Sequence, residues 1–217
     1  MKKFVLNTFV IASLIFTSSC KDKANEAETK EAEDAAMAEA SAVAYNVVPT
    51  ESTIMWKGFK PTGTHNGVIS VSNGSMNVSE DKIESGVFEI DMSSITVKDI
   101  PVEEESHAKL TGHLKSDDFF AIETYPTSKF VVTGMEMKDG KAMLSGNLTL
   151  KDATNNITIP VSMSSEGDMM TLTSDTFTID RSKWNVKYGS KSFFDNLGDS
   201  FINDDIELQI SVKAKKE

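Results

Sequence analysis

Apolar and polar side chains alternate along most of the chain after residue 45, and this period of two constrains the fold more than any other feature. The pattern is clearest where Phe88, Ile90 and Met92 share one face of a segment. It recurs in three further segments, 142–150, 157–163 and 202–212. Successive side chains of a strand point to opposite faces, so alternation is typical of half-buried antiparallel strands. The sequence therefore predicts an all-β domain.

Turn signals divide this domain into eight or nine strands. We expect strands near residues 52–59, 67–72, 75–79, 86–92, 128–137, 141–151, 155–164, 168–180 and 202–214. Sequences typical of hairpin turns lie at Asn66-Gly67, Asn73-Gly74, Asp139-Gly140 and 166–168. The count depends on whether Asn73-Gly74 ends a strand or only kinks it. So many long strands without internal repeats indicate a barrel or a sandwich.

One predicted strand changes parity along its length. Met170 and Leu172 have the opposite parity from Phe177 and Ile179. An extra residue between the two pairs would let all four side chains face inward, so we expect a bulge there.

Residues 103–118 break the alternation. Acidic residues come first, and His113 and Lys115 come near the end, which suits the dipole of a helix. Leu110 and Leu114 lie four residues apart and would share one helical face. We predict a short helix inserted near residues 103–118, followed by the apolar pair Phe119 and Phe120.

Residues 1–20 have the layout of a bacterial secretory leader. Two lysines precede an apolar run at residues 4–16, and small residues follow up to Cys20. The run is shorter than the about 20 residues that a membrane-crossing helix needs, so it directs export and is then removed. Thr17-Ser18-Ser19-Cys20 resembles the lipobox of bacterial lipoproteins. That resemblance implies a signal peptide at residues 1–19 and a lipidated Cys20, which would anchor the protein in the cell envelope, at the periplasmic face or the outer membrane.

The alternative is an ordinary secretory leader with an incidental thiol. Residues 20–44 are predicted to be an acidic, Ala- and Glu-rich tether that is partly helical and separates the anchor from a domain at residues 45–217. The chain carries 22 Lys and Arg against 33 Asp and Glu, a net charge of -11. This balance argues against a nucleic-acid partner, because phosphate binding depends on clustered basic side chains.

Six short motifs, collinear from about Tyr45 to the C-terminus, carry a resemblance to a known family. They are G-x-H-x-G at 63–67, I-D-M-S-S-I at 90–95, H-L-K-S-D-D-F-F at 113–120, Y-P-T-S-K-F at 125–130, G-N-L-T-L at 146–150 and F-T-I-D-R-S-K-W-N-V at 177–186. Together they resemble the YceI-like family. The resemblance implies an extended, eight-stranded, lipocalin-like antiparallel barrel that is periplasmic or secreted. It also implies that the interior binds a polyisoprenoid lipid, such as a prenyl diphosphate or a quinone.

The residues agree with an apolar interior site. An eight-stranded barrel has room inside for side chains or one small ligand, and methionine adapts to irregular apolar shapes. The candidate pocket residues are Trp56, Phe88, Ile90, Met92, Leu114, Phe119, Phe120, Phe130, Leu148, Leu150, Phe177 and Ile179. For each of them alone, packing in a closed core explains the pattern at least as well. Phe119 and Phe120 would either plug one end of the barrel or form a mobile lip.

Three polar residues, His65, His113 and Arg181, are candidates for contact with a lipid head group. Arg181 is the only arginine of the chain, and its planar fork pairs bidentately with phosphate oxygens. The alternative, which the sequence favours somewhat, is a structural ion pair that ties its loop to a neighbouring strand. Both histidines have a structural alternative as hydrogen-bonded side chains. No metal site is expected, because the histidines lack the spacing of ligands.

We therefore expect non-enzymatic binding of an isoprenoid lipid, for transport or storage, without a cofactor. The sequence contains no G-x-S-x-G, H-E-x-x-H, P-loop or Rossmann glycine pattern. Two alternatives stay open. One is a structural or adhesion-type β-domain with a filled core, and the other is a lipid-modifying or redox enzyme that uses a bound quinone. A homodimer is compatible with either.

Overall fold

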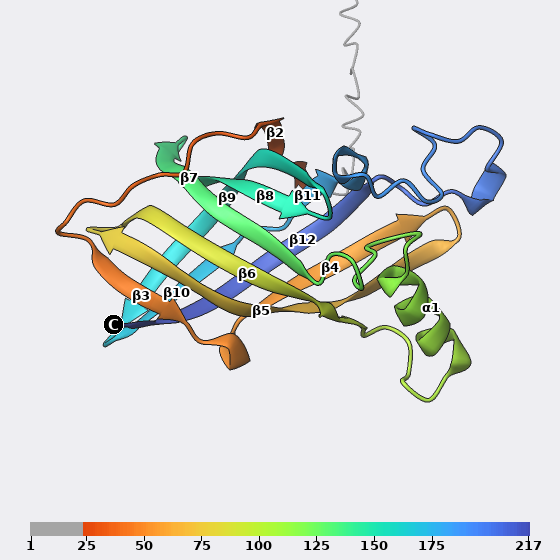
Figure 1. Ribbon diagram of the computed structural model, residues 1–217, viewed down its shortest axis with the longest axis horizontal. Coiled ribbons are helices and arrows are strands. Elements are labelled where there is room, and N and C mark those ends of the chain that lie inside the picture. The colour runs from red at the N-terminus through yellow and green to blue at the C-terminus, as the bar shows by residue number, and fades with distance from the viewer. Residues whose placement is uncertain (1–23) are drawn as a thin grey trace, which may run out of the picture.

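The computed structural model describes residues 24–217 and shows an antiparallel sheet closed into a ring (Figure 1). Strand β12 closes it, because it pairs with β4 on one side and with β10 on the other. The eight strands of the ring are β4 (Thr53–Lys60), β5 (Gly63–Ser79), β6 (Lys82–Val97), β7 (Thr127–Lys138), β8 (Lys141–Leu150), β9 (Ala153–Glu166), β10 (Met169–Ser174) and β12 (Asp205–Lys216). The predicted all-β, barrel-like fold is confirmed, with eight ring strands.

The predicted inward parity matches the observed core. Phe88, Ile90 and Met92 on β6 are all buried, and so are Leu144 on β8 and Ile159 on β9. These side chains come from neighbouring strands and fill the interior of the ring. Burying an aliphatic or aromatic side chain contributes roughly 1.5–3 kcal/mol each, so this alternation is what stabilises the ring.

The predicted turn at Asn66-Gly67 is wrong, because both residues lie inside the long strand β5, and Asn73-Gly74 follows the alternative in which it interrupts the register of a strand without ending it. A Cβ on Gly67 would collide with the carbonyl oxygen of Thr96 and approach the Trp56 ring to 2.8 Å. A Cβ on Gly74 would come within 2.6 Å of the carbonyl oxygen of Val87. These glycines permit close contact within the sheet and do not form turns. The hairpin at Asp139-Gly140 is confirmed, and both residues have positive φ.

The predicted change of parity after Leu172 is confirmed as an interruption of the strand. Strand β10 ends at Ser174, and β11 (Phe177–Asp180) continues beside the same partner, β12. Met170, Leu172, Phe177 and Ile179 are all buried. At this interruption the chain leaves β9, because β11 has no pairing with β9.

The predicted helix is present as α1 (Glu105–Lys115). Figure 1 shows α1 and the blue loop before β12 at one end of the ring, with the C-terminus at the opposite end. Leu114 is buried, and Phe119 and Phe120 beyond the helix are also buried. Three short 3-10 helices, η1 (Pro49–Glu51), η2 (Arg181–Trp184) and η3 (Gly198–Ser200), lie in the connections. No helix within residues 24–217 has the length and apolar character needed to cross a bilayer.

The predicted tether differs most from the structure, although Cys20 itself lies outside the described residues. Residues 24–42, which we call the N-terminal strap, are extended and contain no helix. Strand β1 (Asn25–Glu26) pairs with β11, and β2 (Glu28–Glu31) pairs with β9. The strap therefore fills the seam that β9 and β11 leave open, with Ala27 buried between them.

The strap then crosses the outer face of the ring. Asn147 on β8 accepts a hydrogen bond from the Glu33 amide at 3.0 Å and donates one to the Glu33 carbonyl at 2.6 Å. The amide of Ala36 donates to the carbonyl of Val132, where a register shift interrupts β7 and β8. Strand β3 (Val43–Val47) finally joins both β5 and β12. Backbone hydrogen bonds thus offset the conformational entropy that the strap loses on ordering, although the strap has little apolar surface to bury.

Candidate functional site

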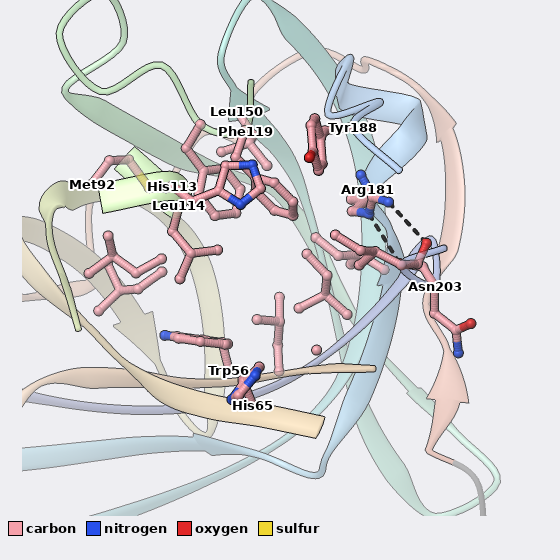
Figure 2. A pocket seen from close by; sticks show the side chains of 18 of the residues that line it. Trp56, His65, Met92, His113, Leu114, Phe119, Leu150, Arg181, Tyr188 and Asn203 are labelled. Carbon is pink, nitrogen blue, oxygen red and sulfur yellow. Dashed lines mark hydrogen bonds between the residues drawn. The ribbon is translucent and has the colours of Figure 1, made fainter. Parts of the chain in front are cut away.

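A cavity of about 350 Å³ lies inside the ring at the end covered by α1 (Figure 2). Its walls come from strands β4 to β8, β11 and β12, from α1 and the segment after it, and from η2, η3 and the loops beside them. Most of the lining is aliphatic or aromatic. The polar residues of the lining are Lys60, His65, His113, Ser128, Arg181, Tyr188, Ser200 and Asn203. The volume lies at the lower end of the range of about 300–1,000 Å³ that is typical of ligand pockets.

Most of the candidate pocket residues are brought together here. The lining includes Trp56, Ile90, Met92, Leu114, Phe119, Phe120, Leu148, Leu150 and Ile179. Phe88 and Phe130 instead line a second, entirely apolar cavity of about 50 Å³. Phe177 lines neither cavity and is only 1% exposed, so it belongs to the closed core.

Two side chains, Ile54 and Ile90, line both cavities and so separate them. The rings of Phe88 and Phe130 lie beyond this partition, with centroids 6.4 Å apart. Gly146 on β8 gives the Phe130 ring its space, since a Cβ there would collide with that ring. The interior of the ring therefore holds two adjoining cavities, with Ile54 and Ile90 between them.

Phe119 and Phe120 pack as a plug in this structure. Their rings meet edge to face at 5.1 Å, and the rings of His113 and Phe119 do so at 5.8 Å. The ammonium of Lys151 donates a hydrogen bond to the Phe119 carbonyl. His113 also meets the ring of Tyr188 at 4.5 Å, so the helix is joined to the loop after η2 by aromatic contacts.

Arg181 has the geometry of the structural alternative. It is fully buried and donates hydrogen bonds to the carbonyl oxygens of Val186, Ile202 and Asn203. Asp204 lies 3.4 Å from its Nη2, and the guanidinium stacks on Phe119 at 5.2 Å. Burial lowers the pKa of Arg181, against the opposing effect of the Asp204 and Asp180 carboxylates. Figure 2 shows Arg181 beside Asn203, with its donors directed to backbone groups of the wall.

His65 lies on the opposite wall from Arg181 (Figure 2). Its Nδ1 is 2.8 Å from a carboxylate oxygen of Asp99, whose other oxygen accepts the Asn66 amide. Partial burial would raise the pKa of Asp99, but the hydrogen bonds from Asn66 and His65 outweigh burial and lower it. His65 is therefore held by a carboxylate at the edge of the cavity.

Trp56 carries an unsatisfied polar atom in the cavity wall. The side chain is only 7% exposed, and its Nε1 has no hydrogen-bond partner among the described residues. Trp184, by contrast, donates from Nε1 to the Leu148 carbonyl at 2.9 Å. Because this nitrogen is itself buried, the missing partner is a cost to the folded state.

Several lining residues were not predicted from the sequence. Tyr188 and Ser200 come from irregular segments without a period-two pattern, whereas Ile202 and Asn203 lie in a stretch that was predicted as strand and forms a loop before β12. The aliphatic members Ile69, Ile95, Ile206 and Leu208 follow strand parity and share the signal of the predicted set. The only available signal for Tyr188 is its position beside Arg181 in the sequence.

Comparison with known proteins agrees with this architecture. The sequence profile of the YceI-like domain matches residues 45–214. The chain belongs to the YceI-like domain family. Within this family, a UPF0312 protein of Shewanella denitrificans is 25% identical over 168 residues, which cover 77% of this chain and 76% of the relative.

Two solved structures resemble this fold. BcnA of Burkholderia cenocepacia has a TM-score of 0.59 and 22% identity, over 78% of this chain and 99% of BcnA. A polyisoprenoid binding domain from Saccharophagus degradans, implicated in plant cell wall breakdown, has a TM-score of 0.58 and 14% identity. That match covers 81% of this chain and 99% of the domain. At these identities the likeness is one of fold.

Proposed function

We propose that this YceI-like domain binds an isoprenoid lipid in the cavity of about 350 Å³, without catalysis. The observation that carries this proposal is a pair of adjoining interior cavities with mostly apolar walls, of which the larger is lined by all the titratable residues, Lys60, His65, His113, Arg181 and Tyr188. Each buried CH₂ of a ligand tail contributes about 0.8 kcal/mol, so recognition by area alone suffices for a long hydrocarbon. The Saccharophagus degradans neighbour, described as a polyisoprenoid binding domain, supports the same ligand class.

The polar residues of the larger cavity favour a neutral head group, such as a quinone or a prenol, over a diphosphate. Arg181 already donates to three carbonyl oxygens and lies beside Asp204, so its charge is engaged within the protein. The exposed ammonium of Lys60 is the other formal positive charge of the lining.

The test is recovery of the ligand from the native source. The protein is purified from its own envelope under mild conditions, and native mass spectrometry followed by solvent extraction identifies what it carries. We expect an isoprenoid in near-equimolar amount. Recovery of a folded protein without any lipid would contradict the proposal.

A matched pair of variants separates the cavity from the core. Leu148→Trp places a larger side chain in the cavity wall, whereas Phe177→Trp enlarges a residue that lines neither cavity. We expect the first variant to lose lipid while it remains folded. The second should lose stability by about 1–3 kcal/mol through overpacking and keep its lipid in the folded fraction. Equal lipid content in both variants would argue against this site.

We also propose that the protein is exported and lipidated on Cys20. The leader at residues 1–19 and the lipobox-like Thr17-Ser18-Ser19-Cys20 support this. Growth with an alkyne-bearing fatty acid should label the wild-type chain, and Cys20→Ala should abolish the label. Label that persists in Cys20→Ala, or that is absent from both chains, would exclude the anchor.

A further inference from the structure

A loop at the rim of the cavity exposes an unusual group of aromatic side chains. We call residues 187–201 the mouth loop; two of its members, Tyr188 and Ser200, line the cavity. Phe193 is 46% exposed, Phe194 50% and Tyr188 45%. The other large hydrophobic side chains exposed within residues 24–217 are Met37, Met55, Val102 and Met137, which lie on separate elements. The aromatic cluster is therefore a local feature of this rim.

Hydrogen bonds hold both ends of the mouth loop in place. Arg181 donates to Val186 at one end of the loop and to Ile202 at the other. Asp204 accepts hydrogen bonds from the hydroxyls of Ser190 and Ser192, and Ser190 is fully buried. A compact loop with its ends fixed by one side chain presents its tip in a defined direction. The hydrogen bonds of Arg181 and Asp204 at the base of the loop thus hold Phe193 and Phe194 in their exposed positions.

The charges around the aromatic rings suit a membrane surface. The ammonium of Lys187 lies 4.8 Å from the ring centre of Phe193, and that of Lys191 lies 3.6 Å from the ring centre of Phe201. Asp195 and Asp199 balance these lysines, so the loop is formally neutral on a chain of net charge -11. Aromatic rings with lysine beside them favour the boundary between water and hydrocarbon.

The attachment of the N-terminal strap brings this rim near the proposed anchor. Glu26 forms an ion pair of 3.1 Å with Lys183, which lies in η2, four residues before the mouth loop. The residues between Cys20 and Glu26 span at most about 20 Å even when fully extended. A chain anchored at Cys20 would hold the ring close to the bilayer, on the side where the mouth loop begins.

We propose that the mouth loop is the surface through which this protein contacts a lipid bilayer, with Phe193 and Phe194 entering the headgroup region beside the rim of the cavity. This goes beyond lipid binding inside the ring, because it assigns a second contact on the outside. It also gives a hydrophobic ligand a short path between the bilayer and the cavity, past Tyr188.

An environment-sensitive fluorophore at two positions tests this contact. In the full chain carrying Cys20→Ser, a bimane label is placed on Asp195→Cys at the loop tip or on Met137→Cys near the far end of the ring. Both proteins are mixed with vesicles of phosphatidylethanolamine and phosphatidylglycerol, with and without brominated acyl chains. We expect a blue shift and quenching by bromine for the label at 195, and neither for the label at 137. Because both chains share the same leader, its adsorption to lipid does not affect the comparison.

Removal of the two phenylalanines completes the test. Phe193→Ser and Phe194→Ser together, added to the Asp195→Cys reporter, should abolish the blue shift and leave the circular dichroism spectrum unchanged. A label at 195 that shows no shift while the protein sediments with vesicles would overturn the proposal and favour a protein partner for the loop. A shift that survives the double substitution would also overturn it. Neither readout depends on a lipid inside the cavity, so failure here leaves the cavity proposal standing.

Discussion

The guanidinium of Arg181 donates a 2.6 Å hydrogen bond to the carbonyl oxygen of Val186, across the base of the mouth loop. Arg181→Lys would leave at least one of the buried carbonyls of Val186, Ile202 and Asn203 without its donor, because an ammonium cannot reproduce the planar fork. We expect a loss of about 2–4 kcal/mol in the free energy of unfolding. Urea unfolding measures it.

The control for Arg181→Lys is Lys183→Ala, which removes only a partly exposed ion pair with Glu26. It should cost less than about 1 kcal/mol. If Arg181→Lys is no more destabilising than Lys183→Ala, then Arg181 does not hold the loop.

The two tryptophans should respond differently to the same truncation. Trp56→Phe removes a buried N–H that has no partner, whereas Trp184→Phe removes a hydrogen bond to Leu148. We expect Trp184→Phe to be more destabilising by about 1–2 kcal/mol in thermal or urea unfolding of the lipid-free protein. Equal losses would mean that the Trp56 N–H is satisfied in solution, for example by an ordered water.

Asp99 predicts a pH dependence with a definite sign. The pKa of Asp99 is lower in the folded protein than in the unfolded chain, because hydrogen bonds from Asn66 and His65 outweigh its burial. The contribution of Asp99 to the free energy of unfolding is therefore fully present above its pKa in the unfolded chain. It is lost as the pH falls through its pKa in the folded protein. We expect Asp99→Asn to lower stability at neutral pH by less than about 1 kcal/mol, with the difference disappearing in strong acid. Asp117→Asn, which removes an exposed carboxylate beyond α1, is the control for the loss of one surface charge.

We expect the side chain of Asn147 to limit local opening of the N-terminal strap. Asn147→Ala removes both hydrogen bonds to Glu33. Amide hydrogen exchange should then speed up across residues 28–36, while the amides of β5 and β6 keep their protection. Uniformly faster exchange through the ring would show that the strap and the ring unfold as one unit.

The ring was predictable because strand parity is a local property. The alternation at Phe88, Ile90 and Met92 already gives the inward face, and in a ring of this size both core and cavity-lining side chains lie on that face. The position of a side chain along the axis of the ring could not be predicted, because it depends on the register between strands. This is why Leu148 lines the main cavity while Phe177, with equally good parity, packs in the closed core.

The structures of the strap and of the mouth loop could not be predicted from the sequence, and the two reasons are related. Backbone pairing with β9 and β11 holds the strap, with Ala27 as its one buried hydrophobic side chain, so its composition indicated a helix-prone tether. The loop around Tyr188 and Asn203 has no periodic pattern, and Arg181 orders it through contacts to carbonyl groups. Side-chain patterns report side-chain burial and say little about such backbone contacts.

The position of strand β12 also fixes when the ring can close during folding. It is the last strand of the chain, and it joins β4 to β10 while β11 beside it receives the first described strand, β1. A chain made from its N-terminus onward leaves both early partners of β12, β3 and β4, unpaired on that side until β12 has been made. Closure is thus a late event with contacts far apart in sequence, which predicts slow folding.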